Sequence, residues 1–202
     1  MVKSHQSSEQ QLRQWMGYTD ILASSFLILM LVTVVSSLNN ATNQKPPLIK
    51  LTEAQSFRFE TGSYKLSQEF KNRLNRVTTN MVSDITKYRI DTIEVIGHTD
   101  GQPSPGISNL DIRLQNQFEK GGELIDGLLT GSNVDLGLLR ALSVAAFLRE
   151  KLKHKEVVMP TILAYSASSL IDSNGKYQPA DPSPQSQRRR IEIRFTRNQD
   201  LK

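Results

Sequence analysis

The longest apolar run of the chain lies near its N-terminus and carries no charged residue from Ile21 to Leu38. At about 1.5 Å of rise per helical residue, the run is about 27 Å long, close to the roughly 30 Å hydrocarbon core of a bilayer. We predict a transmembrane helix over residues 18–38, after a cytoplasmic N-terminal segment at 1–17. A cleaved signal peptide is the alternative, but its apolar core would be shorter, so the length favours a retained anchor.

The pattern changes after this run. A polar segment at 39–50, which contains Pro46-Pro47, is predicted to be a linker. Phe57 and Phe59 then alternate with Arg58, and this period of two predicts a short strand. The next apolar residues recur every three or four positions, which predicts one face of a helix more than five turns long. These residues are Leu66, Phe70, Leu74, Val77, Met81 and Ile85.

The rest of the chain alternates between the two periods. Strands are predicted from Ile93 to His98, from Pro160 to Tyr165 and across Ile191–Phe195, and a helix is predicted from Leu136 to Leu152. The expected order is β-α-β-α-β-β, an α+β fold with a mixed sheet and helices on one face. We place this domain at 51–197, with a short tail at 198–202.

A further segment of the domain, at about 104–132, separates the second predicted strand from the second predicted helix. Leu110, Leu114 and Phe118 recur there at helical spacing, and Gly121-Gly122 follows. We expect a small helix followed by a loop there.

Composition and charge exclude several classes of protein. The chain has no cysteine, which excludes a disulfide scaffold and a cysteine zinc site. The net charge of +5 is modest, aromatic residues make up 6%, and the only dense basic run is 188–190. Nucleic-acid binders concentrate basic charge on one face, so no nucleic-acid partner is expected. An anionic wall polymer or a membrane surface would suit the charge.

Asp20, at the start of the apolar run, has two interpretations. It could cap the membrane helix together with Thr19, because a carboxylate suits the free N–H groups of a helix start. It could instead lie inside a helix bundle and carry an ion, because carboxylates within membrane spans are costly and mark ion pathways. Ser24 and Ser25 would then add hydroxyl oxygens nearby. The residues alone leave both open.

No set of residues predicts an enzyme. We find no Ser-His-Asp order, no zinc set and no pair of carboxylates at catalytic spacing, so neither a metal nor a cofactor is expected. His98 is expected to be a hydrogen-bonded histidine at a strand end, and His5 and His154 are isolated. By itself Asp100 reads as a turn residue before Gly101.

Three segments in order resemble the OmpA-like domain: Gly97-His98-Thr99-Asp100, then Asn133-x-x-Leu136-x-x-x-Arg140-Ala141, then Arg189-Arg190-Ile191-Glu192. The resemblance implies peptidoglycan binding at a diaminopimelate residue of the stem peptide. The ammonium of diaminopimelate would bind Asp100, and the carboxylate of diaminopimelate would accept two parallel hydrogen bonds from the guanidinium of Arg140. The same resemblance places Thr99, Asn133 and Leu136 at the groove, where Asn133 could also cap its helix, and gives a structural role to Gly97, His98, Arg189 and Arg190.

The chain departs from this pattern in three places. The spacing between Asp100 and Arg140 is much longer than is usual in the family. The extra segment, at about 104–132, is an insertion that we expect beside the binding groove or at a dimer contact. Gly137 stands where the family usually has serine, and Arg188 where it usually has asparagine. We expect the local hydrogen bonds to differ at those two positions.

The start of the apolar run, Tyr18-Thr19-Asp20-Ile21-Leu22 followed by Phe26-Leu27-Ile28-Leu29-Met30, resembles the membrane helix of MotB-type stator subunits. The resemblance implies that Asp20 binds and releases H⁺ or Na⁺. It also implies a homodimer inside a ring of five multi-span MotA- or ZorA-like chains, in a bacterial inner membrane, with the C-terminal domain in the periplasm. The short linker and the insertion are more similar to ZorB of Zorya-type anti-phage systems. A passive anchor of the OmpA or Pal type is the alternative.

Overall fold

The structure, a computed structural model, describes residues 2–43, 46–53, 57–104, 106–119 and 127–197. The chain divides into two compact units, residues 1–45 and 46–202. The predicted tail at 198–202 and the Gly121-Gly122 pair lie outside the described residues.

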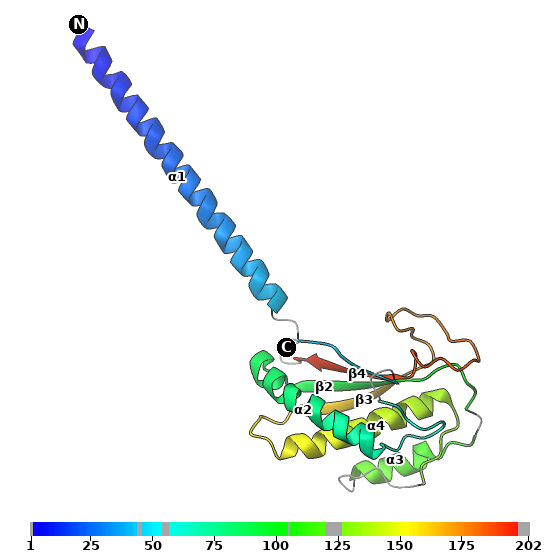
Figure 1. Ribbon diagram of the computed structural model, residues 1–202. Helices are drawn as coiled ribbons and strands as arrows, with labels where there is room; N and C mark the ends of the chain where they lie inside the picture. Colours follow the sequence, from blue (N-terminus) through cyan, green and yellow to red (C-terminus); the bar gives the residue numbers. More distant parts are fainter. Residues whose placement is uncertain (1, 44–45, 54–56, 105, 120–126, 198–202) are drawn as a thin grey trace. The chain divides into compact units, whose positions relative to one another are not determined.

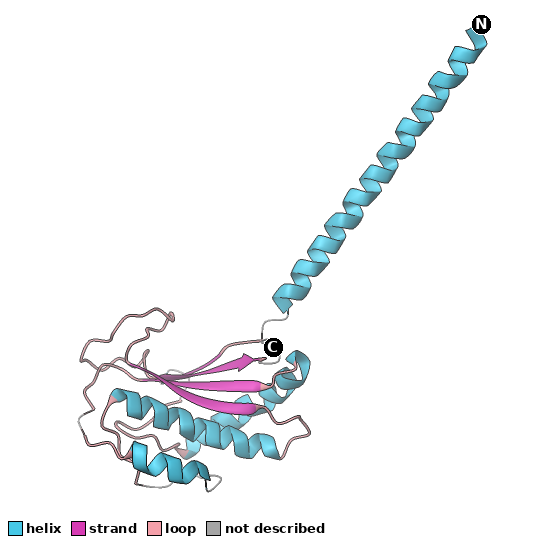
Figure 2. Cartoon of the chain, turned by 180° about the vertical axis from the view of Figure 1, so that it is seen from behind, coloured by secondary structure: helices cyan, strands magenta, loops and turns pink. Residues whose placement is uncertain are grey.

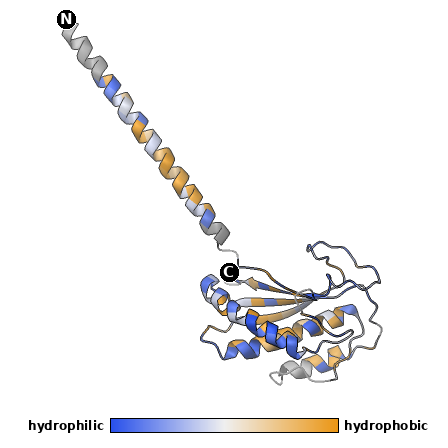
Figure 3. Cartoon of the chain, viewed as in Figure 1, coloured by the Kyte–Doolittle hydropathy of each residue, from blue (hydrophilic) through white to orange (hydrophobic). Residues whose placement is uncertain are grey.

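The first unit is a single helix, α1 (Val2–Asn43). Within it, Gln11–Asn39 is long and apolar enough to cross a membrane. Figure 3 shows this apolar stretch in the middle of the helix. The helix continues beyond the predicted span at both ends, so it takes up the first part of the linker expected at 39–50.

The second unit contains a four-stranded mixed sheet in the order β1-β4-β2-β3. Its strands are β1 (Ile49–Thr52), β2 (Thr92–His98), β3 (Thr161–Ser168) and β4 (Arg190–Thr196). β2 and β3 are parallel, and the other two pairs are antiparallel. The helices cover one face of this sheet (Figures 1 and 2). The predicted α+β fold with a mixed sheet is confirmed.

The predicted strand at Phe57–Phe59 is wrong. The first strand is β1, which begins in the segment that we expected to be a linker and runs into the predicted domain. Phe57 and Phe59 are buried against Phe70, with ring centroids 5.2 and 4.9 Å apart. Their alternation with the exposed Arg58 therefore reflects burial of two rings in the core, without pairing to another strand.

The predicted long helix is α2 (Gln68–Tyr88). Ser67 caps its start by accepting the Phe70 N–H at 3.1 Å, and Arg89 ends it in the left-handed conformation with φ 51°. Its buried face holds four of the predicted residues together with Thr78, whose hydroxyl donates to a backbone carbonyl one turn earlier. The four are Phe70, Leu74, Met81 and Ile85.

The second covering helix is α4 (Asn133–Lys153), which packs against β2 and β3. The insertion adds α3 (Leu110–Glu119), as the spacing of its apolar residues predicted. Leu110 is buried with Leu128 and Leu139 in a second apolar cluster, apart from the main core between sheet and helices. The Asn109 side chain closes the insertion: it donates to the Gly127 carbonyl at 3.0 Å and accepts the Leu129 N–H at 2.8 Å.

Candidate ligand-binding cavity

Asp100 and Arg140 line the same cavity, whose volume is about 530 Å³. The cavity lies where β2 ends and β4 begins, beside the segment at 58–62. Five charged side chains contribute to its wall, three basic and two acidic: Arg58, Arg140, Arg189, Glu53 and Asp100. A wall of this composition suits a ligand that carries both signs of charge.

Asp100 is held in one orientation by three donors. Its Oδ1 accepts the Gln102 N–H at 3.3 Å, and its Oδ2 accepts the Gln185 N–H at 3.2 Å. Arg189 Nη1 also donates to Oδ2. The side chain is only 7% exposed. The carboxylate is thus fixed at the cavity wall rather than free on a turn.

Arg140 reaches the cavity wall from α4, and only 3% of the residue is exposed. Its Nε donates to the Ser63 carbonyl at 3.0 Å, its Nη2 donates to the Glu60 carbonyl at 3.3 Å, and the guanidinium lies 4.9 Å from the centre of the Phe59 ring. Burial lowers the pKa of Arg140 to about 10, although the negative charges of Asp100 and Glu53 oppose this. The group remains a cation at neutral pH.

These contacts leave Arg140 with donors for a ligand. A guanidinium has five N–H groups, and two of them are used in hydrogen bonds to described residues. The other three N–H groups have no hydrogen-bond partner among the described residues, and those at the cavity wall can bind a carboxylate.

Glu53 completes the charged wall. It makes a two-point ion pair with Arg189, in which Nε and Nη2 lie 2.8 Å from Oε1 and Oε2. The hydrogen bond to Glu53, together with the one to Asp100, raises the pKa of Arg189, despite its burial. The sequence did not predict Glu53 as a site residue, because only the pairing of β1 with β4 brings it here. Arg189, expected to be structural, lines the cavity.

Two glycines bring α4 close to the sheet below the cavity. A Cβ atom on Gly97 would overlap the carbonyl oxygen of Gly137, and a Cβ on Gly137 would overlap Ser166 Oγ. The glycine at position 137, where the resembling family has serine, fits this close contact. Arg140 lies one turn further along α4, so this contact also fixes its distance from the end of β2.

The other predicted groove residues lie outside the cavity lining. Thr99 is buried and its N–H donates to the Ser168 carbonyl at 2.9 Å, while Leu136 is 6% exposed. Asn133 donates to the Gln102 carbonyl at 2.9 Å, which ties α4 to the loop after Asp100. The expectation that Asn133 caps α4 is wrong, because the helix is capped by Ser132, which accepts the Asp135 N–H at 3.2 Å.

A buried charged cluster is formed by His98 of β2 with Arg190 and Glu192 of β4. His98 and Arg190 both approach the carboxylate of Glu192, with Arg190 Nε at 3.0 Å and His98 Nε2 at 3.6 Å. Burial lowers the pKa of His98, and contacts with His98, Arg194 and Arg190 hold the pKa of Glu192 far below its usual range. The predicted hydrogen bond of His98 is not made, since 3.6 Å is too long and neither ring nitrogen has another partner among the described residues.

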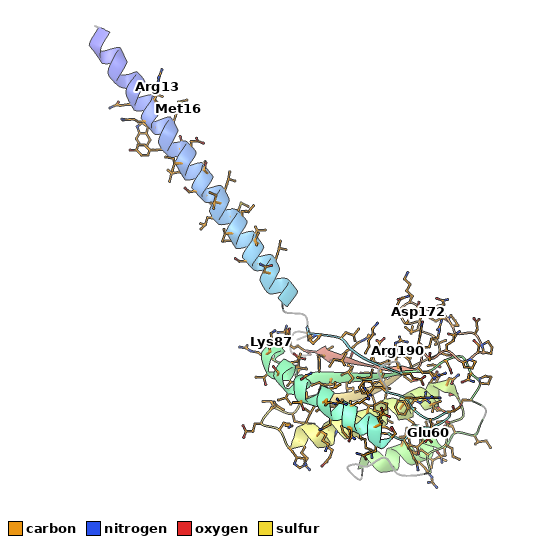
Figure 4. The ribbon with its side chains drawn as sticks, in the orientation of Figure 1. Arg13, Met16, Glu60, Lys87, Asp172 and Arg190 are labelled. Carbon is orange, nitrogen blue, oxygen red and sulfur yellow. The ribbon has the colours of Figure 1, made fainter. Side chains whose placement is uncertain are left out.

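This cluster also secures the loop at 169–188. Arg190 Nη2 donates to the Asp172 carbonyl at 2.7 Å, and both residues lie at the end of the domain away from Lys87 (Figure 4). Arg188, where the family pattern has asparagine, donates to the Gln178 carbonyl at 2.7 Å. The loop supplies Pro184 to the cavity and the Gln185 N–H to Asp100.

In the described part of the chain, no group of three acidic, histidine or cysteine side chains is arranged to hold a metal.

Asp20 lies within the stretch of α1 that is apolar enough to cross a membrane. Because α1 begins at Val2, the N–H groups around Asp20 are inside a continuous helix, and the interpretation of Asp20 or Thr19 as a helix cap is wrong. The Thr19 hydroxyl donates back to the Trp15 carbonyl at 2.8 Å, and the Ser25 hydroxyl to the Ile21 carbonyl at 2.7 Å.

No protein-family model and no curated protein matches the chain. Among solved structures, it is similar to the periplasmic domain of Helicobacter pylori MotB, at 20% identity and a TM-score of 0.45, over 78% of this chain and 80% of that one. A cell wall anchor from Pseudomonas aeruginosa has 20% identity and a TM-score of 0.44, over 74% and 81% of the two chains. The peptidoglycan-associated lipoprotein from Burkholderia pseudomallei has 17% identity and a TM-score of 0.38, over 73% and 89%.

Proposed function

We propose that this chain is the peptidoglycan-anchored B subunit of a MotAB-like, ion-driven rotary motor. Residues 51–197 hold the cell wall in the periplasm, and Asp20 carries H⁺ or Na⁺ in the inner membrane. The observation that carries the proposal is that Asp100 and Arg140, which have opposite charges, line the same cavity. The same chain has a membrane-length helix with a carboxylate inside it.

The cavity has the chemistry to bind the free end of diaminopimelate in a stem peptide. That end carries an ammonium and a carboxylate on one carbon. The three remaining N–H groups of Arg140 suit the carboxylate, and Asp100 Oδ1 suits the ammonium. A volume of about 530 Å³ is within the usual range for small-molecule sites.

The motor role rests on Asp20. A carboxylate in the interior of a membrane helix is costly unless it serves an ion pathway or a partner helix. By resemblance, two copies of this chain would stand within five copies of a multi-span MotA- or ZorA-like subunit, and each Asp20 would be neutralised and exposed in turn. The output would be flagellar rotation or Zorya-type defence.

Wall binding is tested by co-sedimentation of the full-length chain, in detergent, with sacculi whose stem peptides contain diaminopimelate. Asp100→Asn and Arg140→Gln should each abolish the retention. Asp111→Asn and Arg149→Gln remove the same charges at exposed positions and should leave it intact. Equal retention of all four variants would contradict the proposal.

The motor role is tested in cells by Asp20→Asn, with assembly of the complex checked by its native mass. Output should be lost while assembly is retained, and Asp20→Glu, which keeps a carboxylate, should retain part of the output. Full output from Asp20→Asn would contradict the ion-carrying role of Asp20. Only the wall-anchoring part of the proposal would then remain, because a passive anchor tolerates this substitution.

A further inference from the structure

Arg189 is shared between two carboxylates that belong to different parts of the sequence. Its Nε and Nη2 take both oxygens of Glu53 at 2.8 Å, and its Nη1 donates to one oxygen of Asp100. The exposed fractions of the three side chains are 20% for Arg189, 11% for Glu53 and 7% for Asp100. The three groups form one row of charges, negative-positive-negative, along the wall of the cavity.

Strand register places Glu53 at this point. β1 pairs with β4 in an antiparallel arrangement, and the last pair of the ladder is Thr52 with Arg190. One residue further along each strand, Glu53 and Arg189 come opposite each other. The ion pair is therefore built into the edge of the sheet rather than formed by a mobile surface side chain.

The geometry limits what Arg189 can do to Asp100. The two-point pair with Glu53 fixes the plane of the guanidinium, so that only Nη1 reaches Asp100, and it reaches only Oδ2. Oδ2 also accepts the Gln185 N–H. On Oδ1 the sole partner among the described residues is the Gln102 N–H, at 3.3 Å. A carboxylate oxygen has two acceptor sites, so Oδ1 can still accept from a ligand.

We propose that Glu53 is a positioning residue of the cavity, which holds the fork of Arg189 and thereby keeps Oδ1 of Asp100 open to the ligand's ammonium. This inference rests on the proposed binding of diaminopimelate. Without the Glu53 carboxylate, the guanidinium is free to turn and pair with both oxygens of Asp100, which is the preferred geometry of an arginine–carboxylate pair. Asp100 would then be neutralised and covered, while Arg140 would keep its donors for the ligand carboxylate.

The test compares two small probes on the full-length chain in detergent by calorimetry. Mono-N-acetyl diaminopimelate has the free ammonium and carboxylate of the stem-peptide end, and 2-acetamidopimelate keeps the carboxylates but lacks the ammonium. Wild type should prefer the first probe by about tenfold, the scale of one charge-assisted hydrogen bond. Glu53→Gln should remove most of this preference by weakening the first probe alone.

Glu53→Asp keeps the charge but shortens the side chain, and it should retain part of the preference. Glu150→Gln, an exposed carboxylate on α4, changes the net charge equally and should retain all of it. If Glu53→Gln does not fold, the graded loss in Glu53→Asp provides the same comparison.

The outcomes separate this inference from the proposed function. Binding of both probes by wild type, with the preference unchanged in the Glu53 variants, overturns the positioning role and leaves wall binding intact. Equal weakening of both probes also overturns it, because a purely structural contact would act on both. Failure of wild type to bind either probe overturns the proposed function and this inference together.

Discussion

Gly97 and Gly137 face each other so closely that a Cβ atom on Gly97 would overlap the carbonyl oxygen of Gly137. The obstacle to a Cβ on Gly97 is the backbone of α4, which cannot move away by changing a rotamer. This contact sets the spacing between β2 and α4, and therefore the spacing between Asp100 and Arg140.

Gly97→Ala should accordingly destabilise the domain. Overpacking of this kind typically costs about 1–3 kcal/mol, and the rigid backbone places this site at the upper end. Gly137→Ala should cost less, because its nearest obstacle is Ser166 Oγ, the end of a side chain that can rotate, although Gly97 O also lies at 3.0 Å. Urea unfolding of the two variants, followed by circular dichroism, measures both values. If Gly97→Ala instead costs less stability than Gly137→Ala, the backbone of α4 moves away from β2 at this contact.

His98 should make the stability of the domain sensitive to mild acid. Burial lowers its folded pKa below the unfolded value of 6.5, so the neutral ring is favoured by folding. The stabilisation is fully present above about pH 6.5 and is lost as the pH falls below that value, because the unfolded chain then binds the proton. Glu192 acts at lower pH, since its pKa is depressed and its contribution is lost only as pH falls below its usual range.

The measurement is the free energy of unfolding between pH 7.5 and 5. In His98→Gln the fall in this range should be smaller than in wild type, by up to about 1.4 kcal/mol per pH unit, the slope for one proton. His154→Gln is the matched control, because His154 is exposed and pairs with the exposed Glu150 of α4. An unchanged slope in His98→Gln would assign the acid sensitivity to other groups.

Local patterns in the sequence were sufficient for most of the fold. The stripe from Phe70 to Ile85 and the alternation across Ile191–Phe195 describe α2 and β4 directly. The edge strand β1 was missed because it has only four residues and follows Pro46-Pro47, which is typical of a linker.

The candidate site could be predicted only in part. Asp100 and Arg140 belong to motifs with a recognisable order, and the structure places both at one cavity. Glu53 has no local signal, since its place depends on the register of β1 and β4. The same holds for the Ser63 and Glu60 carbonyls that bind Arg140, because a backbone oxygen leaves no trace in the residue type.

The start of α4 offers a separate test of local structure. Ser132→Ala removes the side chain that accepts the Asp135 N–H, and it should cost about 1 kcal/mol of stability, as is usual for an N-cap. Asn133→Ala leaves the cap in place and removes only the hydrogen bond to the Gln102 carbonyl. We expect a smaller loss of stability in this variant, measured by thermal unfolding. A larger loss for Asn133→Ala would show that the tie to the loop outweighs the cap.

Arg140→Lys tests whether the arginine fork, and not only its positive charge, binds the ligand. A lysine ammonium at this position cannot donate to the Ser63 and Glu60 carbonyls and also offer two parallel N–H groups to a carboxylate. Affinity for mono-N-acetyl diaminopimelate should fall by about tenfold or more. Arg149→Lys, on the exposed side of the same helix, is the matched control and should bind as wild type does. Undiminished binding by Arg140→Lys would mean that the ligand carboxylate is held elsewhere, with Arg58 the remaining unpaired cation among the described cavity residues.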